Sequence, residues 1–100
     1  MVIAAALLNE DEHVEAVVCG EYYGNDAVLV VTGQRALTVS TRPYKPDTES
    51  IPRSEITEVN GWIESNRATL KIVAPGSEVV LGDIAELDHA QNAAKILRGT

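Results

Sequence analysis

The chain has 100 residues, 45% of them apolar, and a formal net charge of −7. A chain of this length folds as one domain, and its apolar content excludes a disordered tail. The acidic balance argues against binding nucleic acid or an anionic membrane through charge, and no window approaches the ~18 consecutive apolar residues of a transmembrane helix.

Residues 1–11 form an apolar segment that ends in acidic residues. The run from Val2 to Leu8 has no Lys or Arg before it, and acids follow it at once. A signal peptide needs a basic start, so we interpret residues 1–11 as a packing segment and predict that the domain spans residues 12–98.

Three strands are predicted in the first half of the chain. Their ranges are Val14 to Tyr23, Ala27 to Thr32 and Ala36 to Thr41, and glycine-containing turns separate them. The second run is apolar on both faces, whereas the third alternates and predicts a half-buried strand. Cys19 is the only cysteine, which excludes an intramolecular disulfide and fits a reducing cytoplasm. In its apolar run it is interpreted as a core or strand residue, not a nucleophile.

The middle of the chain reads as a loop followed by short extended segments. Two prolines place residues 42–47 in a loop. Residues 50–52 resume the extended chain, and residues 54–56 favour one helical turn. Further strands are predicted at 57–64, 68–74 and 78–81, with residues 65–67 forming a hairpin loop.

The chain ends in an amphipathic helix that begins near Ile84. Asp83 and Glu86 have the spacing of a capping box. The helix carries one apolar stripe at helical spacing, made of Leu87, Ala90, Ala94 and Leu97. The pattern as a whole predicts a mainly β fold with a C-terminal α-helix, in which an antiparallel sheet bends on itself and the helix covers its open end.

Three segments in this order resemble bacterial pleckstrin-homology (PH) domains of the YokE-like kind and the related GRAM domains. They are LVVTGQRALTVS, ESIPRSEITEVNGW and TLKIVAPGSEVVL with the helix that follows. The resemblance runs from Glu12 to Arg98; it departs from the family pattern at Gly33, where Asp or Asn is common, and at Ala36, where a bulky residue is common. It implies a PH-like bent antiparallel sheet of about seven strands capped by one amphipathic helix. It also implies a domain that binds lipid headgroups or proteins and has neither enzymatic activity nor a cofactor. Bacterial relatives can form oligomers.

Charge and spacing weigh against three kinds of site. Phosphoinositides need Lys and Arg near the first strand pair, but residues 21–26 carry two acids and no base, so we expect neither phosphoinositide nor direct membrane binding. His13 and His89 could be metal ligands together with Cys19, Asp83, Glu86 or Asp88, but no zinc-site spacing is present and we predict no metal. Neither histidine is placed by the sequence beside Cys19 for nucleophilic catalysis.

Arg35 opens the only net-basic segment of the chain, residues 35–53. Arg35, Arg42 and Lys45 could gather into a site for an anion or an acidic partner. The alternative, which we prefer, is a solvated loop plus a structural arginine whose guanidinium bonds turn carbonyls or a nearby carboxylate.

Trp62 is the only tryptophan, and its exposure decides whether the strand predicted at residues 57–64 carries a protein interface. It shares a face with Asn60 and Glu64, so it is exposed if Val59 and Ile63 point inward; alternatively it packs under a neighbouring loop. An exposed Trp near tyrosines favours a protein interface. The candidate interface residues are Trp62, Tyr22, Tyr23, Tyr44, Arg35, Arg42 and Lys45.

These observations favour a non-enzymatic, cytoplasmic interaction or adaptor domain of bacterial or bacteriophage origin. It would act by protein contact or by self-association through Val2–Leu8 or an unpaired strand edge. An alternative is an acidic inhibitor that mimics nucleic acid, although the carboxylates are scattered and not in rows at phosphate spacing. A small-ligand carrier is a third hypothesis, which the low aromatic content disfavours.

Overall fold

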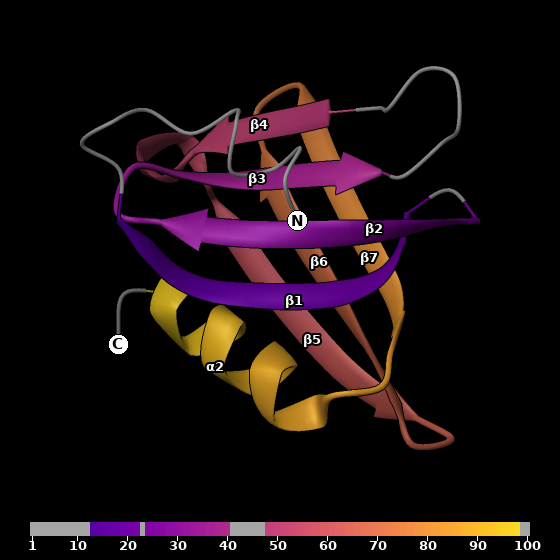
Figure 1. Ribbon diagram of the computed structural model, residues 1–100. Helices are drawn as coiled ribbons and strands as arrows, with labels where there is room; N and C mark the ends of the chain where they lie inside the picture. Colours follow the sequence, from indigo (N-terminus) through magenta and orange to yellow (C-terminus); the bar gives the residue numbers. More distant parts are fainter. Residues whose placement is uncertain (1–12, 23, 41–47, 99–100) are drawn as a thin grey trace.

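A computed structural model describes residues 13–22, 24–40 and 48–98 (Figure 1). These residues form a seven-stranded sheet in the order β4-β3-β2-β1-β7-β6-β5, followed by one α-helix, α2. All the neighbouring strands pair antiparallel. The elements are β1 (Val14–Tyr22), β2 (Asn25–Thr32), β3 (Arg35–Ser40), β4 (Thr48–Pro52), the 3-10 turn η1 (Arg53–Glu55), β5 (Glu58–Glu64), β6 (Arg67–Ala74), β7 (Ser77–Ile84) and α2 (Leu87–Leu97). The predicted fold class is confirmed.

The sheet bends so that its two halves cross. Strands β1–β4 run across Figure 1 in front, β5–β7 run obliquely behind them, and α2 lies along the open side below. The helix packs against β1, β5 and β6. Its apolar stripe is confirmed, because Ala90, Ala94 and Leu97 are buried and Leu87 is partly buried. Within the described ranges, no helix is long and apolar enough to span a membrane.

The two halves join where β1 meets β7, and a glycine makes the approach possible. The bridge at this junction pairs Glu21 with Gly82. A Cβ atom added to the neighbouring Gly20 would lie 2.6 Å from the carbonyl oxygen of Gly82, a distance that real Cβ atoms do not tolerate. Gly20 therefore lets the two backbones pass closely at the bend of the sheet.

The core occupies the inner face of the bent sheet, with a smaller cluster on the outer face of β2 and β3. Leu29 and Leu81 are fully buried in the main core, whereas Val30, Leu37 and Val39 form the outer cluster. Strand β2 is buried on both faces, as predicted.

The prediction of a half-buried β3 was wrong, since Thr38 and Ser40 are only 1% exposed. Small hydroxyl side chains can be buried at low cost when they are hydrogen-bonded. Among the described residues, no buried side-chain nitrogen or oxygen lacks a partner. An alternation of apolar and hydroxyl residues therefore did not mark a solvent-facing side here.

Cys19 lies within β1, which agrees with its interpretation as a core or strand residue, and its side chain is exposed.

The predicted start of the C-terminal helix was wrong. Strand β7 continues through Asp83 to the fully buried Ile84, so the helix begins later, at Leu87. Asp83 therefore cannot cap the helix, and the N-cap residue Glu86 makes no side-chain capping bond. Because Ile84 packs into the core, the strand continues past Asp83, the first residue of the predicted capping box.

Candidate functional site

Arg35 lies at the first position of β3 and contacts the neighbouring turn and strand. Its backbone N–H donates to Thr32 Oγ1 at 3.1 Å. Its Nη1 donates to the Ser50 hydroxyl of β4 at 3.2 Å. Arg35 thus links the β2–β3 turn to β4, as a structural arginine would.

Arg53, which carries no motif in the sequence, binds carbonyl groups of the β2–β3 turn. Its Nη1 donates to the Thr32 carbonyl at 3.1 Å and contacts Glu15 Oε1 at 3.3 Å. Its Nη2 donates to the Ile96 carbonyl near the end of α2 at 2.8 Å, and its backbone N–H donates to the Gln34 carbonyl at 2.9 Å. Carbonyls in the last turn of a helix lack intrahelical partners, so Arg53 joins β1, the β2–β3 turn and the helix end. The sequence IPRSE carries no signal of this role, because the partners are distant in the chain.

Of the candidate interface residues, the structure describes Tyr22, Arg35 and Trp62, which lie on three different strands, β1, β3 and β5. Tyr22 is 7% exposed and belongs to the main core, so its assignment to an interface was wrong. Consecutive strand residues point to opposite faces, and the sequence did not reveal that the Tyr22 ring faces the core. Tyr23, Arg42, Tyr44 and Lys45 lie outside the described residues, as does the segment 1–11.

Trp62 is exposed on β5, the strand at one edge of the sheet. Trp62 is 46% exposed, and the next residue, Ile63, is 52% exposed. The condition stated for this exposure is met only in part, because Val59 is 8% exposed whereas Ile63, on the same face, does not point into the core. The alternative in which Trp62 packs under a loop is therefore wrong. Two large apolar side chains lie open to solvent on adjacent positions of an edge strand.

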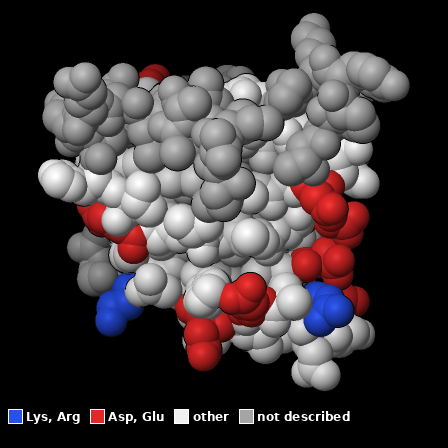
Figure 2. All heavy atoms as spheres, viewed as in Figure 1, with Lys and Arg blue, Asp and Glu red and all other residues white. Residues whose placement is uncertain are grey.

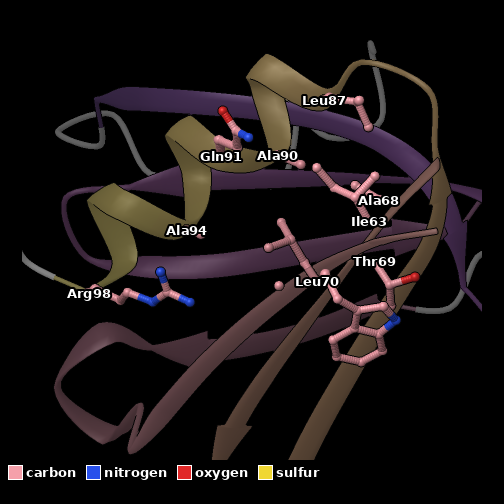
Figure 3. Close-up of a pocket in the computed structure, with 11 residues that line it drawn as sticks. Ile63, Ala68, Thr69, Leu70, Leu87, Ala90, Gln91, Ala94 and Arg98 are labelled. Atoms are coloured by element: carbon pink, nitrogen blue, oxygen red, sulfur yellow. The ribbon is translucent and has the colours of Figure 1, made fainter. Parts of the chain in front are cut away.

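A groove of about 310 Å³ separates β5 and β6 from α2 (Figure 3). One wall comes from the strands, with Gly61, Trp62, Ile63 and Leu70, and the other comes from the helix, with Leu87, Ala90, Ala94 and Arg98. Figure 3 shows Leu87 toward one end of the helical wall and Arg98 at the other. The hollow exists because four of its lining residues are glycine or alanine, namely Gly61, Ala68, Ala90 and Ala94, and their side chains are too small to fill it.

The free edge of β5 borders this groove. Strand β5 is last in the strand order, so within the described part of the chain no strand pairs with its outer edge. Arg98 Nε donates to the Val59 carbonyl at 3.0 Å, which shows that this carbonyl points away from β6. Backbone groups alternate in direction along a strand, so the N–H and C=O groups of Gly61 and Ile63 point the same way. The edge therefore presents these four groups for pairing.

The loop end of β1 and β2 is acidic in the structure. Glu21 and Asp26 are register partners. The hydrogen bond and negative charge of Asp83, then partial burial and the charge of Asp26, raise the pKa of Glu21 above its ordinary value. On the face shown in Figure 2, acidic side chains gather at the right margin and lower edge, while basic ones occupy two separate spots. This arrangement disfavours phosphate binding there.

The described residues hold no group of three or more His, Cys, Asp and Glu side chains that could bind a metal ion. His89 is exposed on α2, and its Nδ1 lies 2.8 Å from Glu86 Oε2. His13 is exposed just before β1.

Comparisons with known proteins bear on the fold. Neither the family models nor the curated proteins searched contain a match to this chain. Among solved structures, a pleckstrin homology domain from Shewanella amazonensis SB2B matches with a TM-score of 0.65 at 16% identity, covering 99% of this chain and 95% of that one. The fold is PH-like. A DUF1696 family protein with a pleckstrin-homology domain from Shewanella loihica PV-4 matches this PH-like chain at a TM-score of 0.62 and 17% identity, covering 96% and 90% of the two chains. The finer YokE-like or GRAM-like assignment stays a prediction.

Proposed function

We propose that this PH-like chain is a non-enzymatic interaction domain that binds a partner polypeptide at the groove between β5 and α2. The observation that carries the proposal is the exposure of Trp62 and Ile63 beside an apolar hollow on a free sheet edge. Tryptophan is enriched among the residues that dominate binding energy at protein interfaces. We name this surface the β5–α2 groove; it comprises Gly61, Trp62, Ile63, Leu70, Leu87, Ala90, Ala94 and Arg98.

The size and chemistry of the groove favour a polypeptide over a small molecule. Its volume of about 310 Å³ is at the lower limit for a small-molecule site, and such sites bury most of their ligand. Here Trp62 and Ile63 remain about half exposed, so the surface can contact more partner area beyond the hollow. A second copy of this chain would satisfy the same requirements, which keeps self-association within the proposal.

Two variants test this surface without removing core residues. Trp62→Ala removes the exposed ring, and Gly61→Val fills the hollow. A Cβ at Gly61 would meet Leu70 Cδ2 at 3.3 Å, the end of a flexible side chain, so we expect the fold to accept the change. Val80→Ala is the matched control, because Val80 is also exposed, at 39%, but does not line the groove.

The measurement has two arms, light scattering during size-exclusion chromatography for self-association and affinity capture for other partners. We expect both groove variants to lose the oligomer or the captured proteins, and Val80→Ala to keep them. Retention of all partners by both folded groove variants would contradict the proposed function.

A further inference from the structure

We infer that the partner binds as an extended strand along the free edge of β5, with an apolar side chain in the groove and a carboxylate at Arg98. This inference rests on the proposed function and specifies its ligand. The partner is thus an extended peptide segment that contains an apolar residue and an acidic group.

The backbone of β5 is prepared for strand addition. The Val59 carbonyl is occupied by Arg98, but the next two outward positions, Gly61 and Ile63, face the free edge. Both residues are exposed. Gly61 has no side chain to hinder the approach of another backbone, which is a recurrent role of glycine in strands. An added strand would exchange main-chain hydrogen bonds with these two residues.

The groove would then take a side chain of the added strand. Side chains of a strand alternate between its two faces, so every second residue of the added strand would point toward α2. That face meets Leu70 on the sheet side and Ala90 and Ala94 on the helix side, and all three are buried and apolar. An aliphatic or aromatic side chain would fill the space that the alanines leave.

Arg98 supplies the charge that selects the acidic group. Its Nε is used in the bond to Val59, whereas none of the ion pairs formed among the described residues includes this guanidinium. Figure 3 shows the guanidinium at one end of the groove. The Nη groups of an arginine form strong, charge-assisted hydrogen bonds with a carboxylate. The carboxylate could belong to an Asp or Glu side chain or to the C-terminus of the peptide.

The test uses a displayed library of random peptides of about ten residues, long enough to span ~33 Å when extended. We select the tightest-binding peptide whose displayed form is displaced by an excess of the same peptide in free form. It is then altered in three ways. In a first series one backbone nitrogen at a time carries an N-methyl group, in a second variant the acidic side chain is changed to its amide, and in a third the C-terminus is amidated. Affinities are measured for the unaltered protein and for Gly61→Val, Trp62→Ala and Arg98→Gln.

Strand addition predicts that N-methylation weakens binding at alternate positions only, by about tenfold for each lost hydrogen bond. Removing the acidic group from the peptide should weaken binding to the unaltered protein but not to Arg98→Gln, and the two amide forms show which carboxylate is used. The neutral peptide should bind Arg98→Gln as it binds the unaltered protein, which controls for folding.

Other outcomes separate this inference from the proposed function. A peptide that is sensitive to Gly61→Val but shows no alternation in the N-methyl series would overturn strand addition and leave the groove as the binding surface. An acidic group that matters equally in Arg98→Gln would overturn the role of Arg98. A library that yields no peptide sensitive to Gly61→Val or Trp62→Ala would count against both the inference and the proposed function.

Discussion

Strands β3 and β5 differ in burial although both belong to the same sheet. From Ala36 to Ser40 every residue of β3 is buried, whereas in β5 only Val59 is. Strand β3 pairs on both sides, with β2 and β4, whereas β5 pairs with β6 alone. The difference indicates that strands paired on both sides supply core contacts, whereas substitutions on the exposed face of the β5 edge should cost little stability.

The largest expected effect comes from opening a cavity in the buried half. Leu29→Ala removes a fully buried side chain from β2. We expect it to lower the free energy of unfolding by about 2–5 kcal/mol, measured by urea denaturation. The matched change in the exposed strand, Ile63→Ala, should cost no more than about 0.5 kcal/mol. Equal losses in the two variants would contradict the comparison.

The junction between the halves provides the next test. Gly20→Ala would force a Cβ against the Gly82 carbonyl, and we expect a loss of about 1–3 kcal/mol from overpacking. Gly82→Ala lies on the partner strand, where the nearest atom is Thr69 Oγ1 at 3.8 Å. That variant should retain nearly full stability in the same denaturation experiment, and a Gly20→Ala protein as stable as Gly82→Ala would refute the close approach.

Arg53 tests how the β2–β3 turn is tied to the helix. Arg53→Ala leaves the Thr32 and Ile96 carbonyls without this donor, and we expect a loss of about 1–2 kcal/mol by chemical denaturation. The loss should depend little on salt, because the partly exposed pair with Glu15 contributes little. Arg35→Ala removes a bond to the Ser50 hydroxyl at the exposed surface, and this variant should lose less. A larger loss for Arg35→Ala would reverse the assignment.

The smallest expected effect is a pH dependence at the junction. Because Asp83 raises the pKa of Glu21 in the folded protein, the folded state holds this proton more tightly than the unfolded state. The stability that this proton contributes is present below the ordinary pKa and is lost as pH rises through the raised value. Glu21→Gln should therefore weaken the decline in stability between about pH 4 and pH 7. Denaturation curves of the two proteins at several pH values would show this, and parallel pH profiles would contradict it.

Local pattern predicted the elements well and the site only in part. The turn in VLVVTGQRALTVS and the stripe from Leu87 to Leu97 were recognisable because strand and helix periodicities are local properties of the chain. The burial of Tyr22, by contrast, could not be predicted, because it depends on which face of β1 lies against the core. Arg53 was missed because its partners, Glu15 and Ile96, are more than thirty residues away in the chain.

A mainly β fold with a C-terminal helix was predictable from the amino-acid pattern, since alternation and helical spacing are imposed by backbone geometry. The position of β5 at the edge of the sheet was not predictable from that pattern, because strand order depends on contacts between distant segments. The tertiary structure also places Gly61 in the same groove as Ala90 and Ala94. These small residues leave a hollow only because the fold brings β5 and α2 together. The exposed Trp62 takes on its proposed role because it lies beside this groove.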